Sequence, residues 1–202
     1  DRYRVEPAGK RGLAGDAVMF PAPSRPGLLP YLSFKLSDPE AMVQNVGIGD
    51  LNGDGKYDFV VKTPRAVNID PYPRFWYPSP TTFKLEAFLS DGTRLWTYDM
   101  GPGIERGVWY SPAIIYDFDG DGKAEVVVKA AEGDPRAPDG RVTSGPEYFA
   151  VLDGMTGKVI AKAPCPSRDN FESYNFFSRN QLAMAYLDGK TPAIIALRGT
   201  YG

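Results

Sequence analysis

The feature that most constrains the fold of this chain is an internal repeat with a period of 67 residues. Three Gly-Lys pairs follow one another at this spacing: Gly55-Lys56, Gly122-Lys123 and Gly189-Lys190. A short apolar run, rich in β-branched residues, follows each pair at 59–61, 126–128 and 193–196. Such runs are typical of buried strands. The chain is therefore expected to build the same β-unit more than once.

Oxygen-bearing side chains recur in the first two copies of this repeat. In the nine-residue segments 50–58 and 117–125, positions 1, 3, 5 and 9 are Asp, Asn or Glu, and positions 4 and 6 are Gly. This alternation surrounds one point with the hard oxygen ligands that Ca²⁺ prefers, whereas an EF-hand has its last acid at position 12 between helices. The Lys at position 7 would contribute its backbone carbonyl. The predicted calcium ligands are Asp50, Asn52, Asp54, Lys56, Asp58, Asp117, Asp119, Asp121, Lys123 and Glu125.

The alternative to calcium is a pair of solvated Asp-Gly turns between strands. Calcium is favoured because carboxylates clustered within one short loop repel one another unless a cation neutralises them. The third copy keeps the turn and the apolar strand but has lost the ligands. Met184, Tyr186 and Pro192 stand where the second copy has acidic residues. A turn without metal is predicted there.

A second pattern, within each of the first two copies, indicates the fold class. Residues 88–96 and 150–160 both read as strand, Asp-Gly turn and strand, which is typical of a β-hairpin. One unit is thus a strand that follows an acidic loop, a long connection and a hairpin. Sheets repeated at this scale, with insertions between strands, indicate an all-β protein made of β-propeller blades.

The length predicts a partial propeller. About two and a half units fit in the chain, whereas a propeller closes with four blades or more. An open arc would leave an unpaired strand edge, so the chain is expected to be a fragment that the rest of a propeller completes. The expected organisation is lead-in strands at 1–45, a first repeat at 46–112, a second at 113–179 and the start of a third at 180–202.

Composition excludes several classes of function. The 202 residues include no His, which excludes Ser-His or Cys-His catalysis and His-ligated metals. The formal net charge is −2 and no basic stripe is present, so nothing favours a nucleic-acid partner. No apolar run approaches membrane-spanning length. Cys165 stands alone between two prolines and is expected to be a passive thiol in a loop.

A series of short blocks along the chain carries a family resemblance. The blocks are, in order, 46–58, 91–96, 106–107, 116–125, 140–142, 144–148, 185–189 and 198–199. They resemble the rhamnogalacturonan lyases of polysaccharide lyase family eleven, and the Ser-Gly-Pro-Glu-Tyr block at 144–148 is especially specific. The resemblance implies part of an eight-bladed, calcium-dependent propeller that cleaves the rhamnogalacturonan I backbone of pectin by β-elimination.

Two segments depart from the family pattern. Residues 64–80 are unusually rich in Pro and aromatic residues, and residues 168–180 match the family only loosely. Because substrate would be read in both places, another polymer of rhamnose and uronate stays open as the substrate. The aromatic residues of the first segment predict either a stacking platform for sugar rings or loops packed onto the propeller: Tyr72, Phe75, Trp76 and Tyr77.

The chemistry of a uronate lyase defines the candidate catalytic residues. The enzyme removes the C5 proton, expels the oxygen at C4 and neutralises the carboxylate whose charge opposes this step. Without His, the base would be Lys, Tyr, Arg or a carboxylic acid of raised pKa, and Arg suits the carboxylate because it pairs bidentately. The candidate catalytic residues are Arg106, Lys129, Arg141 and Arg198, and the candidate substrate-binding residues are Tyr148, Arg179 and Trp76.

Structural alternatives stay open for these side chains. Lys129 ends a strand, as Lys62 does, and would then cover a sheet edge; Arg141 and Arg198 would each hold a loop carbonyl. Two functions follow. The first is a lyase that acts on an acidic polysaccharide of the rhamnogalacturonan type. The second is a non-catalytic, calcium-stapled propeller that binds polysaccharide or a cell-surface partner. Either is expected to be secreted or periplasmic, where calcium is plentiful enough for loops of modest affinity.

Overall fold

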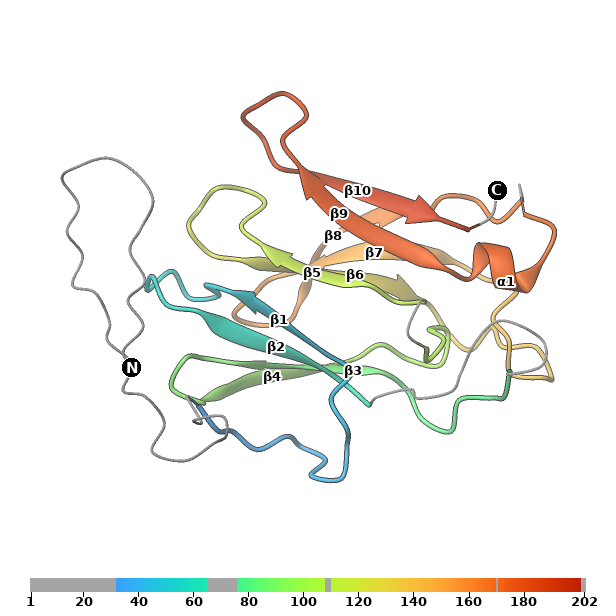
Figure 1. Cartoon of the computed structure of the whole chain (residues 1–202), viewed down its shortest axis with the longest axis horizontal. Helices are drawn as coiled ribbons and strands as arrows, with labels where there is room; N and C mark the ends of the chain where they lie inside the picture. The colour runs from blue at the N-terminus through green and yellow to red at the C-terminus, as the bar shows by residue number, and fades with distance from the viewer. Residues whose placement is uncertain (1–31, 65–75, 108–109, 170, 201–202) are drawn as a thin grey trace, which may run out of the picture. The chain divides into compact units, whose positions relative to one another are not determined.

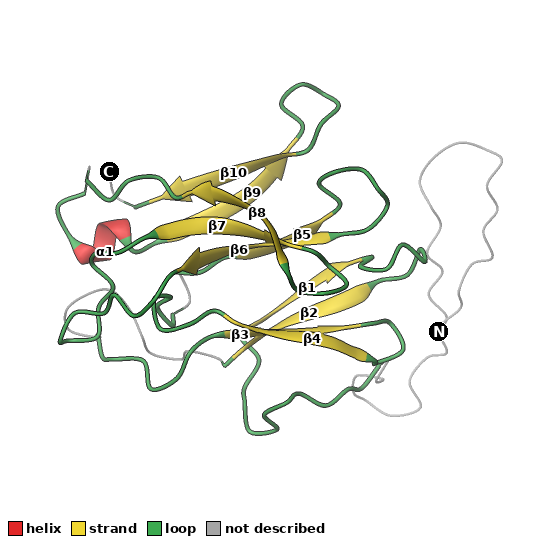
Figure 2. Cartoon of the chain, turned by 180° about the vertical axis from the view of Figure 1, so that it is seen from behind, coloured by secondary structure: helices red, strands yellow, loops and turns green. Residues whose placement is uncertain are grey.

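The structure, a computed structural model, describes residues 32–64, 76–107, 110–169 and 171–200. Contacts divide the chain after Ser33, and the unit that begins at Phe34 holds every strand described here. These strands form three antiparallel sheets (Figures 1 and 2). The first sheet contains β1 (Asn45–Gly49), β2 (Asp58–Thr63), β3 (Lys84–Phe88) and β4 (Arg94–Asp99). The second contains β5 (Ala113–Tyr116), β6 (Glu125–Ala131), β7 (Glu147–Leu152) and β8 (Val159–Pro164). A short helix, α1 (Tyr174–Phe177), precedes the third sheet of β9 (Asn180–Ala185) and β10 (Ala193–Arg198).

The strands follow the sequence repeat. In the first two sheets, neighbours in space are also neighbours in sequence, in the orders β1-β2-β3-β4 and β5-β6-β7-β8. β5 begins at Ala113 and β9 at Asn180, the positions where the second and third repeats were placed. β1 begins at Asn45, one residue before the first repeat. The two predicted hairpins are β3–β4 and β7–β8. Residues 32–44, the described part of the predicted lead-in strands, form no strand.

Burial separates inner strands from outer ones. All of β2 except Phe59 and all of β6 except Ala131 are buried, as expected for strands paired on both sides and covered on both faces. β8, at the outer edge of its sheet, is exposed throughout. The first two sheets share one hydrophobic core, which includes Val60, Leu85, Trp96, Val126, Val128 and Leu152.

Glycines allow β1 and β5 to approach closely. A Cβ atom at Gly47 would lie 1.9 Å from Ile115 Cδ1, and one at Gly49 would lie 2.4 Å from Ile115 Cγ2. Because real Cβ atoms do not come this close to other atoms, only glycine is compatible with this packing. The neighbouring strand β9 in turn contacts β5. The first strands of the three sheets therefore lie in succession, β1 beside β5 and β5 beside β9.

A tryptophan connects the last strand of the first sheet to the last hairpin of the second. Trp96 of β4 donates its indole N–H to the carbonyl of Gly154, in the β7–β8 turn, at 2.8 Å. In the same turn, a Cβ atom at Gly157 would lie 2.6 Å from the Trp96 ring. The last strand of the first sheet is thus held against the hairpin of the second.

The two ends of the sheets carry different kinds of loop. The β1–β2, β5–β6 and β9–β10 loops gather at the left in Figure 1, and the long β6–β7 connection and α1 lie at the right. Within the described residues, no helix is long and apolar enough to cross a membrane.

Candidate functional site

The acidic loop of the first sheet, between β1 and β2, is organised by its own carboxylates. Asp50 accepts hydrogen bonds from the backbone N–H groups of Gly53 and Gly55, each at 2.7 Å. Both glycines have positive φ angles, of 77° and 81°, which side chains disfavour. Asp54 accepts the N–H of Lys56 at 2.9 Å and also pairs with its ammonium at 3.2 Å. These contacts, the backbone bond first, lower the pKa of Asp54.

The last acid of this loop serves the fold. Asp58 is fully buried at the start of β2. Its two carboxylate oxygens accept the N–H groups of Leu51 at 2.8 Å and Ser90 at 2.7 Å. Asp58 therefore links the acidic loop to the β3–β4 turn. At position 3 of the loop, the neutral Asn52 accepts the N–H of Asp54 at 3.0 Å.

The acidic loop of the second sheet, between β5 and β6, repeats the backbone geometry. Asp117 accepts the N–H groups of Gly120 at 2.7 Å and Gly122 at 3.0 Å. Asp121 accepts the N–H of Lys123 at 2.8 Å, as Asp54 does for the corresponding lysine. The side chain of Lys123 is exposed and makes no ion pair among the described residues.

Carboxylates converge in this second loop. Oxygen atoms of Asp117, Asp119 and Glu125 lie within 4.8 Å of one another. Glu125 receives one N–H, from Phe118 at 2.8 Å. Its burial and the neighbouring acids raise the pKa of Glu125. This donor set fits a hard divalent cation, which would relieve the repulsion. No such trio forms in the described first loop, where position 3 is an amide.

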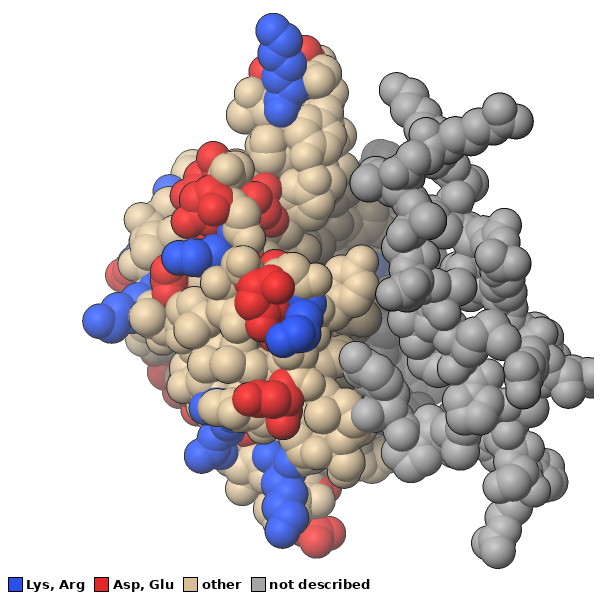
Figure 3. All heavy atoms as spheres, turned by 90° about the vertical axis from the view of Figure 1, so that its left-hand side faces the viewer, with Lys and Arg blue, Asp and Glu red and all other residues tan. Residues whose placement is uncertain are grey.

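The two loops lie next to each other at one end of the sheets. The N–H of Ala124 donates to the carbonyl of Asp50 at 2.7 Å, so the backbone itself connects them. Figure 3 faces this end and shows acidic side chains gathered in patches, with Lys or Arg among them. In the third sheet, Asp188 accepts the N–H groups of Lys190 at 2.8 Å and Thr191 at 2.7 Å, which closes the β9–β10 turn.

A buried charged network occupies the opposite end of the second sheet. It consists of Lys129, Glu105, Glu147, Arg168 and Arg198. Lys129 is 1% exposed and lies 3.6 Å from Glu147 Oε1 and 3.9 Å from Glu105 Oε2. Arg168 pairs with Oε1 of Glu147, and Arg198 pairs with Oε2. Because β6 is an inner strand, the alternative that Lys129 covers a sheet edge is wrong.

Arg198 is fully engaged by protein groups. Besides Glu147, it donates to the carbonyl of Pro166 at 2.6 Å and to that of Phe177 at 2.8 Å. Its side chain is 1% exposed. It thus ties the end of β10 to the start of β7 and to the loop before α1. Holding loop carbonyls was the structural alternative that the sequence left open for this residue.

Glu105 extends the network toward an aromatic group. Its Oε1 accepts the hydroxyl of Tyr174 at 2.9 Å, whereas its Oε2 has no hydrogen-bond donor and faces Lys129. Burial, and then the negative charge of Glu105, raise the pKa of Tyr174. Burial also lowers the pKa of Lys129, an effect that Glu105 opposes.

Arg141 and Trp76 meet beside Tyr174. The Arg141 guanidinium lies 5.3 Å from the centroid of the Trp76 ring and 5.4 Å from that of Tyr174. It also pairs with Asp139 at 2.7 Å, and its side chain is 23% exposed. Trp76 donates its indole N–H to the carbonyl of Asp139 at 3.0 Å. The structure therefore brings these two predicted site residues together, in contact with solvent.

The remaining predicted residues make other contacts. Arg106 is 8% exposed and donates to Thr81 Oγ1 at 2.8 Å. Arg179 donates to Asn175 Oδ1 at 3.0 Å. Tyr148 lies under the ammonium of Lys162, which is 4.2 Å from its ring centroid. Of the other residues of the aromatic segment, Tyr77 is exposed, and Tyr72 and Phe75 lie outside the described residues.

The sequence did not identify four members of this arrangement as site residues: Glu105, Glu147, Arg168 and Tyr174. Glu147 stands in the block at 144–148, which carries the family resemblance. A buried lysine is commonly paired with a carboxylate, and that tendency would have directed attention to Glu147. Nothing local marks the other three, because their partners are 21 to 69 residues away in the chain.

A shallow pocket of about 440 Å³ opens onto the network. Its lining includes Ser144, Gly145, Cys165, Arg168 and Arg198. The side chain of Arg168 is 18% exposed, whereas those of Lys129 and Arg198 are 1% exposed. Burial raises the pKa of the Cys165 thiol, which agrees with a passive role in the loop.

Comparison with known proteins gives consistent matches. The family model described as "Rhamnogalacturonan lyase family 11, C-terminal domain" matches residues 39–202. The rhamnogalacturonan endolyase YesW of Bacillus subtilis (strain 168) is 37% identical over 177 residues, 78% of this chain and 28% of that protein. The rhamnogalacturonan exolyase YesX of the same organism is 33% identical, with the same coverage of both chains. The crystal structure of YesX aligns with a TM-score of 0.72 and 32% identity, over 79% of this chain and 29% of that one. The chain thus spans less than a third of the length of the curated relatives it matches.

Proposed function

Since this chain belongs to rhamnogalacturonan lyase family 11, we propose that it serves in a calcium-dependent polysaccharide lyase that cleaves rhamnogalacturonan I-type pectin by β-elimination at the uronate. Two relatives of similar sequence identity are an endolyase and an exolyase. The proposal therefore states which bond is cleaved, but not whether cleavage occurs within the polymer or at its end. The substrate is an acidic polysaccharide outside the cell, where calcium is abundant.

We further propose that the sheets are blades of an eight-bladed propeller. The succession of β1, β5 and β9 supports this arrangement, because first strands of neighbouring blades line the axis of a propeller. Apolar side chains of the last sheet also support it. Ile194 of β10 is 37% exposed, and Leu197 of the same strand is 51% exposed. Such surfaces suit the packing of further blades.

Calcium in this proposal is held by the acidic loops. In the second loop, Asp117, Asp119 and Glu125 already converge, and the first loop offers the corresponding set with Asn52 and Asp58. The ion supplies positive charge that neutralises the clustered carboxylates. The loops then hold the entries of β2 and β6 rigidly, and through the bond between Ala124 and Asp50 they hold each other.

Among the predicted catalytic residues, we assign contact with the uronate carboxylate to Arg141. The observation that carries this assignment is its solvent access: its side chain is 23% exposed, whereas those of Lys129 and Arg198 are 1% exposed and satisfied by protein groups. Trp76 and Tyr174 lie within about 5 Å of the guanidinium and provide faces on which a sugar ring can stack. Lys129 and Arg198 are positioning residues that hold the end of the sheet.

The reaction requires charge neutralisation first. In the elimination, the C5–H and C4–O bonds break, a C4–C5 double bond forms, the proton passes to a base and the C4 oxygen leaves with a proton. The uronate carboxylate must be neutralised because negative charge develops beside it, and a guanidinium does this while it stays protonated. Tyr174 is not the base, since its hydroxyl donates to Glu105 and its pKa is raised.

The test measures ultraviolet absorbance of the new double bond as the protein acts on rhamnogalacturonan I, with calcium and then with a chelator. Arg141→Gln is expected to lower kcat/KM by about tenfold or more, because a neutral amide replaces a charged partner of the carboxylate. Arg136→Gln is the matched control, since Arg136 also pairs with an aspartate two residues earlier and is exposed. An equal loss in both variants would remove Arg141 from the site.

A non-catalytic binding propeller is the second candidate. The observation that favours it is the closed state of the charged network, in which Lys129 and Arg198 have no group free for substrate. It predicts calcium-dependent retention of the polysaccharide with no rise in absorbance. Carrying out both measurements on the same preparation of the protein separates the two functions.

A further inference from the structure

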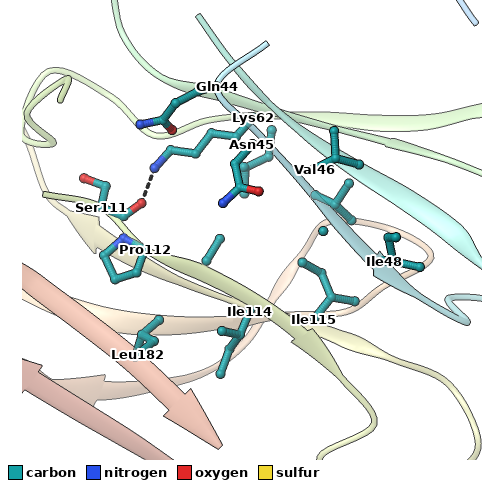
Figure 4. A pocket seen from close by; sticks show the side chains of 14 residues that line it. Gln44, Asn45, Val46, Ile48, Lys62, Ser111, Pro112, Ile114, Ile115 and Leu182 are labelled. Carbon is teal, nitrogen blue, oxygen red and sulfur yellow. Dashed lines mark hydrogen bonds between the residues drawn. The ribbon is translucent and has the colours of Figure 1, made fainter. Parts of the chain in front are cut away.

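A cavity is lined by the first two sheets and by Leu182 of β9, and none of its described lining residues belongs to the charged network or to the acidic loops. Its volume is about 550 Å³, within the range of small-molecule sites. Most of the side chains that line it are aliphatic, and four polar side chains stand at one side (Figure 4). The aliphatic residues include Val46, Ile48, Val60, Ile114, Ile115 and Leu182. The polar side chains are Gln44, Asn45, Lys62 and Ser111, and Lys62 is the only charged or titratable one among the described residues that line the cavity.

Lys62 is buried here without a carboxylate. It is 5% exposed, and its ammonium donates to the carbonyl of Ser111 and lies 4.2 Å from the centroid of the Phe83 ring. No acid among the described residues lies within ion-pair distance of it. Burial alone lowers the pKa of Lys62 to about 7. A carbonyl and an aromatic face compensate an ammonium only in part, so the site favours an added anion.

The second sheet shows what a lysine at this strand position pairs with. Lys129 follows Lys62 by the repeat distance of 67 residues, and each lies near the end of the second strand of its sheet. Two glutamates face Lys129, at 3.6 and 3.9 Å. In the first sheet, a cavity faces Lys62 instead. At equivalent positions of the two sheets, the lysine thus faces carboxylates in the second sheet and a cavity in the first.

We propose that this cavity binds a small carboxylate, which pairs with Lys62 and lays its body against the aliphatic wall. The chemical class of the ligand follows from the residues that line the cavity. A single lysine matches one negative charge, whereas a phosphate dianion would need further cations. Gln44 already donates to the carbonyl of Gly107 at 3.1 Å, and the Ser111 hydroxyl donates to that of Glu105 at 3.4 Å, which leaves Asn45 as a second polar contact. This site does not depend on the lyase reaction and uses none of the residues assigned to it.

The experiment is titration calorimetry of the folded chain with matched acid and neutral probes. D-galacturonate is compared with D-galactose, and butyrate with 1-butanol, so the two pairs separate a sugar acid from an aliphatic acid. We expect one acid to bind saturably at least tenfold more tightly than its neutral match. Repeating the titration in two buffers of different ionisation heat is expected to show proton uptake on binding, because a paired carboxylate favours the charged lysine.

Two variants of the cavity and one control decide the outcome. Lys62→Met removes the cation and keeps the length of the side chain. Asn45→Asp keeps the shape but puts an acid beside Lys62, since the two residues are directly paired between β1 and β2. Each is expected to lower the affinity for the acid at least tenfold. The control Lys84→Met, at an exposed lysine of β3, is expected to leave the affinity unchanged. Binding of neither acid at millimolar concentration, equal binding of the neutral match, or unchanged affinity in Asn45→Asp overturns the proposal.

Discussion

The first and second sheets are two copies of one backbone plan with different side-chain partners. Both have four antiparallel strands in sequence order, an acidic loop before the second strand and a hairpin at the end. Yet Lys129 of the second sheet is enclosed by Glu105 and Glu147, while Lys62 of the first faces a cavity. The repeat therefore reproduces strand order and turns, whereas the chemistry at equivalent positions depends on what other segments bring there.

The acidic loops show the same difference on a smaller scale. Glu125 of the second sheet stands with two other acids, and its pKa is raised. At the equivalent position of the first sheet, both carboxylate oxygens of Asp58 accept hydrogen bonds from backbone N–H groups. At positions 1, 3, 5 and 9, the two loops thus differ by one methylene group, Asp58 against Glu125, and by one amide in place of an acid, Asn52 against Asp119. In the second loop the carboxylates converge, whereas in the first the last acid stabilises a turn. Four experiments follow from this comparison, in order of expected effect.

The largest effect is expected where the lysines are exchanged for Met. Lys129→Met leaves two buried glutamates without their lysine, and it is expected to lower the free energy of unfolding by about 3–5 kcal/mol. Lys62→Met removes a buried charge that has no acid partner, so stability at pH 7 is expected to stay the same or to rise. Urea denaturation measures both. Similar losses in the two variants would show that the lysines are equivalent after all.

Per pH unit, a smaller effect is expected in the pH dependence of stability. The pKa of Lys62 is about 7 in the folded protein and near 10.4 in an unfolded chain, so the unfolded state binds more protons between these values. The free energy of unfolding is therefore expected to rise with pH in this window, by up to about 1.4 kcal/mol per pH unit from this group. Below pH 7 the cost of burying the charge is fully present. The measurement is the difference between the original chain and Lys62→Met, and a constant difference from pH 7 to 10 contradicts the assignment.

A more modest effect is expected at the acidic loops, where we propose that calcium binds. Asp119→Asn gives the second loop the amide that the first has at position 3, and Asn52→Asp does the reverse. With calcium at ten times its Kd, bound metal adds about 1.4 kcal/mol, or roughly 3–5 °C in unfolding temperature. We expect Asp119→Asn to lose part of this gain and Asn52→Asp to add to it, with little change in chelator. Thermal unfolding with and without calcium is the check, and equal shifts in both conditions would count against bound metal.

The smallest effect is expected at position 7 of each loop. The side chains of Lys56 and Lys123 are exposed, and only their backbone carbonyls are predicted to face the ion. Lys56→Ala and Lys123→Ala are therefore expected to leave the unfolding temperature and its calcium dependence unchanged. A loss of the calcium effect in either variant would mean that the side chain helps to hold the loop in its binding form.

Local features of this molecule could be predicted well. The turns at Asp50, Asp117 and Asp188 are made by an aspartate that accepts N–H groups two to five residues away, and this chemistry is visible in a short segment. The hairpins could be predicted for the same reason. The candidate site could be predicted only in part: Arg141 and Trp76 do meet, but the prediction that Lys129 covers a sheet edge was wrong. Sequence position alone says that a lysine ends an apolar run; it does not say that further strands pair on both sides.

The sequence by itself determined the repeat, the all-β class, the acidic loops and the family, because each depends on residues close together in the chain or on their spacing. Only the tertiary structure decided which side chains are partners. Glu105, Glu147, Arg168 and Arg198 surround Lys129 from separate segments, and the cavity beside Lys62 exists because β1, β2 and β5 leave space there. Pairing and burial arise when distant segments pack together, and the energy of a charged group depends on that surrounding more than on its neighbours in sequence.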